Sequence, residues 1–493
     1  VAIVGSGPGG LACAYHLALE GYDPVIFEAA PEPGGWLRYG IPEYRLPRKV
    51  LDQEINYLKK LGVEIRTNTP IGEGRTINDL LTRDGFRAVY LGVGCSDSLK
   101  IPVPGADAQD VLWGVDYLRD SSAGKKFDFS GKKVVVIGGG NVAMDVARTA
   151  KRQNPAEISI ICLENREEMP ANTWEVEEAE HEGIPITHRL GVKQIIAKGG
   201  KVTGLELKAV ERVFDEEGRF APTYFEDKLS TQDCDVVIMA IGQKANLSFL
   251  TEADGVELNR GLIAADPDTL ATSREGVFAG GDVVSGPYIA IAAVAAGMEA
   301  AKSIDRYLNG QDLKADREFP LRPIKDGEWN PIPYDQPKKP RADMPTMSGD
   351  WTKSFKEINL GFDKETAMAE AERCINCGVC SECMQCVHEC QAGALAHEQA
   401  PKKFDLDVGA VVLAPGFQPY DPSQYSAYHY ANYPGVVTSM EFERILSASG
   451  PYAGHLIRPS DHKEPKKIAW LQCVGSRDLN HCDNSYCSSV CCM

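Results

Sequence analysis

Residues 1–20 read VAIVGSGPGGLACAYHLALE, and this stretch predicts the fold of the first half of the chain. The apolar strand VAIV leads into a glycine-rich loop, and a helix is expected from Leu11 to Glu20. Gly5 permits the tight turn, Gly7 lets the backbone approach a pyrophosphate, and Gly10 lets the helix pack close to the strand. The free N–H groups and the dipole at the helix start favour an anion. The loop residues are Gly5, Ser6, Gly7, Pro8, Gly9 and Gly10.

The features that follow the loop distinguish a dinucleotide site from a simple glycine turn. Strand PVIFE, residues 24–28, comes next and ends on Glu28, an acid suited to the ribose hydroxyls of an adenosine. A GxGxxG pattern alone is weak, and a glycine turn without a ligand is the alternative interpretation. Because the strand, the helix, the second strand and the acid follow one another in the order of a dinucleotide-binding unit, the sequence favours dinucleotide binding.

A second unit of the same design begins at Lys133 with KVVVIGGG. A helix is expected from Val142 to Arg152, followed by the strand ISIICLE at residues 158–164. The alternative is a strand–helix turn in a Rossmann-like fold that binds nothing. Two such units in one chain predict two bound dinucleotides. The second loop comprises Gly138, Gly139, Gly140, Asn141, Val142 and Ala143, with alanine in the third glycine position.

A third element, GVFAGGDVVSGPYIAIAAVAAGMEAA, covers residues 276–301. Gly281 and Asp282 follow a predicted strand and precede a helix of small residues. One interpretation is that Asp282 only caps that helix. Beside the first glycine loop, the sequence favours a functional role, in which Asp282 bonds to the ribityl chain of a flavin.

Several long motifs in residues 1–310 carry a family resemblance. They are VAIVGSGPGGL, GGWLRYGIPEYRLPRKV (34–50), VVVIGGGNVAMDVART, REEMPA (166–171), AIGQKAN (240–246) and GVFAGGDVV. This part resembles the glutamate synthase small subunit family, a branch of the two-dinucleotide flavoprotein disulfide-reductase fold. The resemblance implies an α/β, Rossmann-like flavoprotein fold with FAD on the first loop and the nicotinamide cofactor on the second. It also implies that Gly35, Trp36 and Leu37 lie near the flavin, and that the turn at Gly242 leads back to the flavin domain.

The second unit, which the resemblance assigns to the nicotinamide cofactor, is expected to prefer NADH over NADPH. In NADPH-using members of the resembled family, two arginines commonly precede the REEMPA-like run, and the matching positions here are Leu163 and Glu164. A 2′-phosphate needs arginine forks, whereas a carboxylate accepts hydrogen bonds from ribose hydroxyls. In the alternative interpretation Glu164 is a solvated residue at a strand end, and Arg166 or another arginine binds the phosphate.

Fifteen cysteines are present, and eleven of them fall between Cys374 and Cys492. Clustering at short gaps in a large chain indicates metal ligation in a reducing compartment, so a cytoplasmic location is expected. The first run contains Cys374, Cys377, Cys380, Cys383, Cys386 and Cys390. Its last four members have the bacterial ferredoxin spacing, which predicts a 4Fe-4S cluster in preference to zinc. The other two are either spare thiols or ligands of a second cluster that borrows from elsewhere.

The remaining cysteines of the first half stand alone in sequence, at Cys13, Cys95, Cys162 and Cys234. Isolated cysteines are usually small buried hydrophobes. Thioredoxin-reductase-like relatives use a CxxC pair beside the flavin, and no such pair occurs in residues 1–310. We therefore expect electrons to leave through the cysteine-rich segment and not through a dithiol.

The stretch after Asp407 carries VGAVVLAPGFQPYDP, VVTSMEFERILSASGP, LIRPSDHKEPKKIAWLQCVGSRD and YCSSVCCM. It is similar to a later portion of the FAD- and iron–sulfur-containing subunit of heterodisulfide reductase, a hub family that sometimes acts by flavin-based electron bifurcation. Strands are expected at residues 408–416 and 466–473. A few buried thiols are the alternative to a cluster here. The cluster ligands implied by the resemblance are Cys473, Cys487, Cys491 and Cys492, with Cys482 unassigned.

The whole chain has 493 residues, a net charge of −18, and 43% hydrophobic residues. This length predicts several domains, and the acidic surface argues against nucleic acid or an anionic membrane as a partner. No run of 18 apolar residues occurs, so no membrane span is expected. The chain opens on Val1 inside an apparent strand and closes on Met493 after a cysteine pair, so further segments are expected beyond both ends.

These observations predict an FAD-dependent NAD(H) oxidoreductase that moves electrons between NADH, FAD and one to three 4Fe-4S clusters, as one component of a larger heterodisulfide reductase-like complex. No side chain need act as an acid or base, so no catalytic residue is predicted. The alternatives are the electron-input small subunit of a glutamate synthase and an assembly scaffold with vestigial dinucleotide sites. The expected domains are FAD-binding (1–115 and 244–310), NAD(H)-binding (116–243), a linker and helix (311–370, with the helix at 364–372), a ferredoxin-like 4Fe-4S segment (371–400) and an incomplete heterodisulfide reductase-like segment (401–493).

Overall fold

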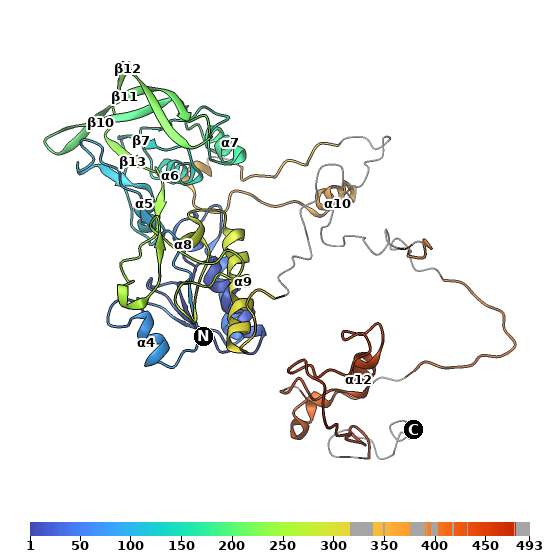
Figure 1. The fold of residues 1–493 in the computed structure, drawn as a ribbon. Coiled ribbons are helices and arrows are strands. Elements are labelled where there is room, and N and C mark those ends of the chain that lie inside the picture. Colours follow the sequence, from blue (N-terminus) through green and yellow to red (C-terminus); the bar gives the residue numbers. More distant parts are fainter. Residues whose placement is uncertain are drawn as a thin grey trace. The chain divides into compact units, whose positions relative to one another are not determined.

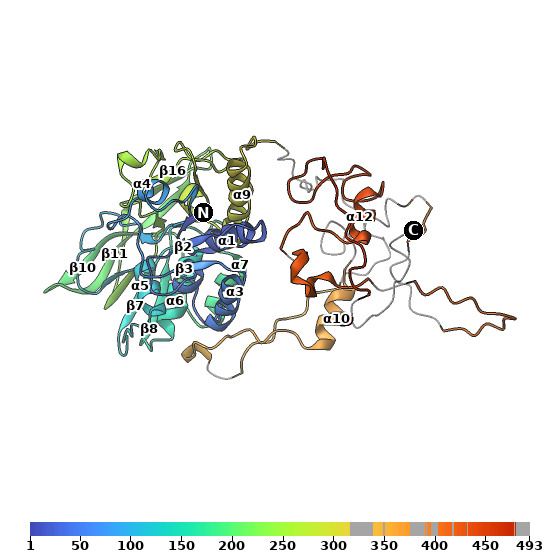
Figure 2. The same ribbon diagram turned by 90° about the horizontal axis from the view of Figure 1, so that it is seen from below.

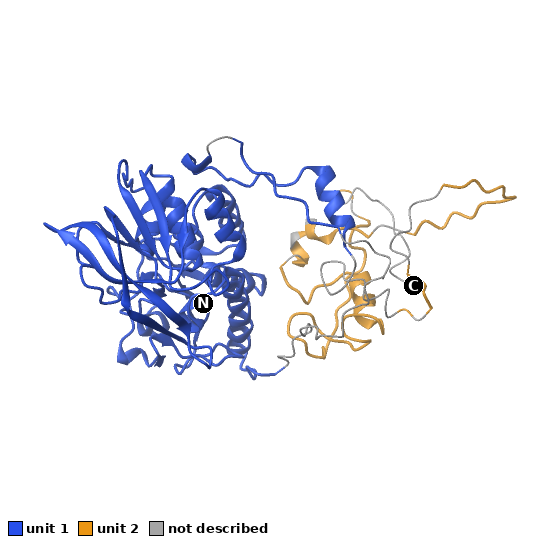
Figure 3. Ribbon diagram, turned by 90° about the horizontal axis from the view of Figure 1, so that it is seen from above, with its two compact units in different colours: residues 1–388 blue, residues 389–493 orange. Residues whose placement is uncertain are grey.

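The computed structural model describes most of the chain and divides it into two compact units, residues 1–388 and residues 389–493 (Figure 3). The first unit contains two parallel sheets, each covered by helices, and the second is mostly irregular. The domain boundaries given above stay predictions. The described residues are 1–315, 339–348, 351–374, 390, 392–395, 403–416, 419–430, 432–477 and 479.

A five-stranded sheet with the order β17-β4-β1-β2-β3 forms the core of the half predicted to bind FAD, called here the flavin-side half, and all of its pairings are parallel. Its strands are almost entirely apolar because both faces are covered. Alternate residues enter different clusters: Ala2 and Val4 lie on one face and Ile3 on the other. The strands are β1 (Ala2–Val4), β2 (Val25–Phe27), β3 (Glu64–Arg66), β4 (Val89–Leu91) and β17 (Val277–Ala279).

Two helices, α1 (Pro8–Leu19) and α9 (Ala290–Leu308), pack side by side on the face of this sheet that carries Ile3 (Figure 2). Their approach depends on glycine, because a Cβ at Gly297 would lie 2.2 Å from the carbonyl oxygen of Gly9. The other helices of this half are α2 (Trp36–Tyr39), α3 (Arg48–Lys60), α4 (Ile77–Thr82), α8 (Asp282–Ser285) and the 3-10 turn η1 (Glu252–Asp254).

The second sheet has the order β6-β13-β7-β8-β9 and is also parallel throughout. It lies in the half predicted to bind the nicotinamide cofactor and is called here the nicotinamide-side sheet. Its strands are β6 (Val111–Trp113), β7 (Lys133–Ile137), β8 (Glu157–Ile161), β9 (Ile186–Thr187) and β13 (Val236–Met239). Helices α5 (Gly114–Ser122), α6 (Asn141–Lys151) and α7 (Thr173–His181) cover one face. The other face packs against an antiparallel sheet of β10 (Leu190–Lys198), β11 (Lys201–Phe214) and β12 (Phe220–Gln232), seen beside β7 and β13 in Figure 1.

Two short antiparallel ribbons are the remaining strand pairs among the described residues of the first unit. The pair β5 (Asp97–Ser98) and β14 (Gln243–Lys244) stands where the chain passes from the first sheet to the second and back. The pair β15 (Leu258–Asn259) and β16 (Leu262–Ile263) is a local hairpin. A 3-10 turn, η2 (Trp351–Lys353), precedes α10 (Lys364–Glu372), and α10 confirms the helix expected before the cysteine run.

The predicted dinucleotide units are confirmed as elements. Strands β1, β2, β7 and β8 occur at the predicted apolar runs, although β8 ends at Ile161, three residues before the expected end at Glu164. Helix α1 begins at Pro8, three residues before the expected Leu11. Proline is favoured in the first helical turn because its missing N–H would have no helical partner there. The antiparallel sheet β10–β12 was not predicted, since it adds no glycine loop or motif of its own.

The second unit corrects two predictions. The apolar stretches at residues 408–416 and 466–473 were expected to be strands, but both are irregular, and the described part of this unit contains no strand. Val412 is 90% exposed and Leu413 is 86% exposed. These runs have the composition of a buried strand, but the described residues of this unit provide no sheet with which they could pair. Among the described residues of this unit, the helical elements are η3 (Pro422–Gln424), η4 (Ser426–Tyr428) and α12 (Ser439–Leu446).

Candidate functional site

The first glycine loop joins β1 to α1, and its glycines are required by the backbone. Gly5 has φ +98°, and a Cβ there would lie 2.6 Å from the carbonyl oxygen of Gly92. A Cβ at Gly10 would lie 2.0 Å from the carbonyl oxygen of Gly5. Gly7 differs, because its φ of −67° suits any residue and only the oxygen of Gly92, at 3.9 Å, lies near its Cβ position. Space is therefore left over Gly7, and no side chain caps the helix that starts at Pro8.

Glu28 is held against this loop from the end of β2. Its carboxylate accepts hydrogen bonds from the backbone N–H of Ser6 at 2.9 Å, from the Ser6 hydroxyl, and from the N–H of Ala30 at 2.7 Å. Glu28 is 8% exposed. A carboxylate has about four acceptor positions, so one remains for a ligand hydroxyl. The predicted acid and the predicted loop are thus in direct contact.

The motif that begins GGWL also reaches the first loop. Gly34 donates its N–H to the Ser6 hydroxyl at 2.9 Å, and a Cβ at Gly35, whose φ is +52°, would lie 2.7 Å from the Cα of Gly7. Gly35 is the N-cap of α2, whose first two residues are Trp36 and Leu37. The three residues expected near a flavin therefore start directly beside the first glycine loop.

Gly281 and Asp282 follow β17, which is two strands from β1 in the same parallel sheet. The carboxyl ends of parallel strands share one edge, so Asp282 lies at the edge that carries the first loop. Its carboxylate accepts a hydrogen bond from the N–H of Tyr288 at 3.3 Å, and burial raises the pKa of Asp282. The Cys95 thiol donates to the Asp282 carbonyl oxygen at 3.2 Å, which fastens this turn to the segment after β4.

The second glycine loop has the same construction between β7 and α6. Gly138 has φ +144°, and a Cβ there would lie 2.2 Å from the carbonyl oxygen of Ala240. Gly140 is the N-cap of α6 without a side-chain hydrogen bond to the helix, and Asn141, Val142 and Ala143 form its first turn. The Asn141 carboxamide oxygen accepts the N–H of Asn172 at 2.8 Å, which ties the REEMPA segment to the loop.

Glu164 lies against the second loop, since its Oε2 is 2.5 Å from the position of a Cβ at Gly139. The residue is 8% exposed, so the interpretation of Glu164 as a solvated residue is wrong. Burial raises the pKa of its carboxyl group, although backbone N–H groups partly oppose this. The two arginines of this neighbourhood are engaged by acids: Arg166 pairs with Glu180, and Arg189 donates to Glu168 at 3.0 Å.

Gly242 forms the turn between β13 and β14 with φ +134°, and its carbonyl oxygen accepts the N–H of Leu99 at 3.0 Å. It therefore stands where the chain leaves the second sheet to return to the first, as the family resemblance implied. A side chain with a Cβ is disfavoured at this φ, which is in the range that glycine tolerates best.

The four isolated cysteines are buried and unpaired by disulfide, as expected. Burial raises the pKa of Cys95, Cys162 and Cys234 to about 12, and it raises the pKa of Cys13 as well. A thiol with a raised pKa is a poor nucleophile because the thiolate is the reactive form. These cysteines therefore act as small core residues.

Three of the predicted cluster ligands are described. Cys374 is exposed and follows α10 directly, Cys390 is half-buried with its sulfur accepting the N–H of Ala394, and Cys473 is half-buried with φ +67°. Among the described residues no set of three or more potential ligands is gathered for a metal ion. The other predicted ligands, together with Cys482, lie outside the described residues: Cys377, Cys380, Cys383, Cys386, Cys487, Cys491 and Cys492.

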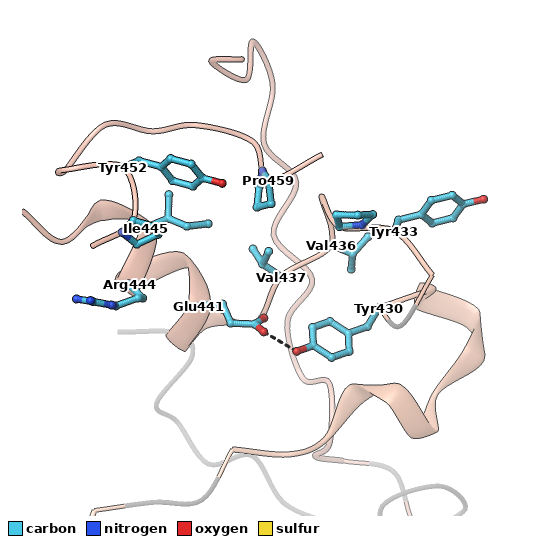
Figure 4. A pocket seen from close by; sticks show the side chains of 11 residues that line it. Tyr430, Tyr433, Val436, Val437, Glu441, Arg444, Ile445, Tyr452 and Pro459 are labelled. Atoms are coloured by element: carbon cyan, nitrogen blue, oxygen red, sulfur yellow. Dashed lines mark hydrogen bonds between the residues drawn. The ribbon is translucent and has the colours of Figure 1, made fainter. Parts of the chain in front are cut away.

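A pocket of about 480 Å³ lies in the second unit, beside α12 (Figure 4). Its wall is aromatic and aliphatic, with one polar contact in which the Tyr430 hydroxyl donates to Glu441 at 2.6 Å. None of the residues predicted to bind a dinucleotide or a cluster lines it. The lining residues are Tyr430, Tyr433, Pro434, Val436, Val437, Glu441, Arg444, Ile445, Pro451, Tyr452 and Pro459.

The sequence of the part that carries both glycine loops matches a known family. The family model for pyridine nucleotide-disulphide oxidoreductases covers residues 1–297, so the chain belongs to this family. It is therefore an oxidoreductase with sites for FAD and a nicotinamide dinucleotide. FprA of Mycobacterium tuberculosis, solved in complex with NADPH, has a TM-score of 0.55 at 18% identity, over 63% of this chain and 84% of FprA. That likeness supports the fold alone.

Two curated relatives are more similar in sequence. The chain is 41% identical over 391 residues to the NADP(+)-dependent formate dehydrogenase subunit beta of Moorella thermoacetica, which covers 76% of this chain and 54% of that protein. It is 34% identical to the glutamate synthase (NADPH) small chain of Escherichia coli strain K12, over 62% of this chain and 68% of that protein. The second match confirms the resemblance to the glutamate synthase small subunit family. The chain spans about half the length of the formate dehydrogenase subunit.

Within the described ranges, no helix has both the length and the apolar character needed to cross a membrane.

Proposed function

We propose that this chain is an electron-transfer subunit that moves electrons between NADH, FAD and 4Fe-4S clusters within a larger complex. The observation that carries the proposal is the pair of complete phosphate loops, each in contact with a buried acid, Glu28 at the first and Glu164 at the second. The names of two relatives, subunits of a formate dehydrogenase and a glutamate synthase, support a role as one component of an electron-transfer assembly.

The residues at the first loop fit FAD. The open space over Gly7 and the uncapped start of α1 suit a pyrophosphate, and the remaining acceptor position of Glu28 suits an adenosine ribose. Ser6, Pro8 and Gly9 would complete the phosphate loop, Asp282 would bind the ribityl chain, and the segment from Gly35 to Leu37 would contact the ring. Bound FAD supplies the exchange between two-electron and one-electron transfer that a nicotinamide donor and an iron–sulfur acceptor require.

The residues at the second loop fit a nicotinamide dinucleotide. The uncapped start of α6 would bind its pyrophosphate, and Glu164 would accept hydrogen bonds from the hydroxyls of an unphosphorylated ribose. Arg166 pairs with Glu180 and Arg189 with Glu168, so a 2′-phosphate would compete with these acids for the two arginines, although Nη1 of Arg189 has no hydrogen-bond partner. These contacts support a preference for NADH, although both relatives described above carry NADP or NADPH in their names.

The electron exit is proposed to be the cysteine-rich region. The buried, high-pKa thiols of the first half are unsuited to dithiol exchange, whereas the run from Cys374 to Cys390 has ferredoxin spacing. A separate cluster on Cys473, Cys487, Cys491 and Cys492, and membership of a heterodisulfide reductase-like complex, are proposed from the motif resemblance alone.

An anaerobic titration of the purified protein tests this function. Adding NADH is expected to bleach the flavin absorbance and then to produce the electron paramagnetic resonance signal of reduced clusters. An assembly scaffold with vestigial sites would leave the spectrum unchanged. Bleaching without any cluster signal, in protein with full iron content, would contradict the proposed electron exit. Bleaching by NADH in protein that binds no iron would favour the alternative of a glutamate synthase small subunit, which the 34% identity supports.

The double variant Cys383→Ala/Cys386→Ala is expected to lose about one cluster's worth of iron, four atoms per chain, because each cubane iron needs a thiolate ligand. Iron content and low-temperature electron paramagnetic resonance of the reduced protein measure the loss. Cys234→Ala is the matched control, since this buried thiol is not proposed as a ligand. Unchanged iron and unchanged spectra in the double variant would show that the cluster is held elsewhere.

A further inference from the structure

Within residues 1–315, the chain crosses between the flavin-side and nicotinamide-side sheets at the ribbon of β5 and β14. This ribbon has two residue pairs, Gln243 with Ser98 and Lys244 with Asp97. A two-stranded ribbon twists easily and is marginally stable by itself. The separation of the two glycine loops therefore depends also on contacts between the two halves, such as the packing of Trp36 against the core of the second sheet and the hydrogen bond from Arg48 to Ser122.

Arg45 connects the two halves through two acids at once. It belongs to the loop between α2 and α3 on the flavin side, and its Nη1 lies 2.7 and 2.8 Å from the two carboxylate oxygens of Asp145 in α6. Its Nη2 lies 2.7 Å from Oε1 of Glu175 in α7. The side chains of Asp145 and Glu175 are only 10% and 5% exposed. A planar guanidinium bound in this way fixes both distance and angle between the elements that it joins.

The neighbouring Tyr44 continues the junction. It is 1% exposed, and its ring lies under the guanidinium of Arg152, 3.8 Å from the ring centroid. Arg152 is bonded in turn to Glu182 at 2.7 Å and donates to the Ser354 carbonyl oxygen at 2.8 Å. Ile358 donates its N–H to the Tyr44 carbonyl oxygen at 3.2 Å. Residues 354–358 thus cover the junction and join it to the segment that leads to α10.

We propose that Arg45 is a positioning residue for electron transfer between the two dinucleotides. Through Asp145 it holds α6, whose first turn carries the second glycine loop, in a fixed relation to the loop at Gly7. This inference rests on the proposed function. A buried ion pair is better suited to fixing one arrangement than to adding net stability, because desolvation offsets most of its attraction.

The variant Arg45→Met removes the guanidinium and keeps most of the aliphatic stem. It leaves two acids buried together, and burial already raises the pKa of Asp145 to about 6 with Arg45 present. The variant could therefore unfold for an unrelated reason, so the triple variant Arg45→Met/Asp145→Asn/Glu175→Gln, which is neutral at the junction, is measured beside it. Arg219→Met is the matched control, because it removes an exposed arginine that also pairs with two acids, Asp215 and Glu217.

The dissociation constants of FAD and NADH are expected to stay within about twofold of the native values, because each loop keeps its own contacts. The rate constant of flavin reduction by bound NADH is expected to fall by about tenfold to hundredfold, the size of effect that a misplacement of about 1 Å produces. Arg45→Lys should restore only part of the rate, since an ammonium group cannot bind both acids in a fork. Hydrogen exchange at residues 97–98 and 243–244 should become faster in the neutral triple variant.

A folded triple variant with native reduction rate and native exchange in the ribbon would overturn the proposal. A weakened NADH dissociation constant with an unchanged rate constant would overturn it as well, since Arg45 would then serve binding. Failure of the proposed function is distinguishable, because native protein would itself show no flavin reduction. In that case the exchange comparison between the native protein and the triple variant still decides whether Arg45 holds the two halves together.

Discussion

Replacing Gly7 with valine is expected to leave a folded protein that purifies without FAD. The position has φ −67°, which valine adopts without strain, and the nearest protein atom to its Cβ would be the oxygen of Gly92 at 3.9 Å. The side chain would instead fill the space over which a pyrophosphate must approach the backbone. We expect FAD binding to weaken by about 100-fold or more, which corresponds to ~2.7 kcal/mol. Flavin released on denaturation, counted per chain by chromatography, measures the effect.

Two companion variants separate binding from folding. Gly10→Val should lose both FAD and stability, because its Cβ would meet the Gly5 carbonyl oxygen at 2.0 Å. Gly409→Val makes the same change where no atom lies within 4 Å and should alter neither property. A Gly7→Val protein that carries one FAD per chain would contradict the assignment of the first loop, as would flavin identified as FMN in the native protein.

Replacing Glu164 with arginine is expected to reverse the preference between nicotinamide cofactors. The native carboxylate lies against Gly139 in the second loop and would repel the 2′-phosphate of NADPH. An arginine at this position would provide charge-assisted hydrogen bonds, worth about 1.5–3 kcal/mol each, to the phosphate. The ratio of flavin reduction rates with NADH and NADPH at equal concentration should therefore shift by about tenfold to hundredfold.

Glu164→Gln is the matched control, since it removes the negative charge and keeps the shape of the side chain. It should reduce the preference for NADH over NADPH without reversing it. The predicted preference for NADH differs from the cofactor named for the formate dehydrogenase and glutamate synthase relatives, which carry NADP or NADPH in their names. A faster reaction of the native protein with NADPH would show that Arg166 or Arg189 leaves its acidic partner to bind the phosphate. A ratio unchanged by Glu164→Arg would show that Glu164 does not face the ribose.

The fold and the loop residues could be predicted because their signals are local. Gly5 and Gly138 are demanded by turns between adjacent elements, and the apolar runs of β1 and β7 are buried on both faces. The same kind of apolar run led to a wrong prediction of a strand at residues 408–416. Apolar composition indicates that a segment favours burial, but a strand also needs a neighbouring strand with which to pair. Whether such a run becomes a strand depends on residues distant in the sequence.

The junction at Arg45 could not be predicted for a related reason. Its partners Asp145 and Glu175 are 100 and 130 residues away, so no local pattern joins them. A weak signal was present, since two charged residues, Asp145 and Arg148, interrupt a helix whose other buried positions are apolar except for Thr149. Charged residues on the buried side of a helix indicate partners from another element, but they do not say which element.

The order of the first sheet has a consequence for how the chain folds during synthesis. Strand β17 completes the sheet beside β4, yet every strand of the nicotinamide-side sheet lies between β4 and β17 in the sequence. On the ribosome the nicotinamide-side half can close while β4 still presents an unpaired apolar edge. A nascent chain arrested before Val277 would thus carry one finished half and one aggregation-prone half. We expect its survival in the cell to depend on chaperones until the last strand is made.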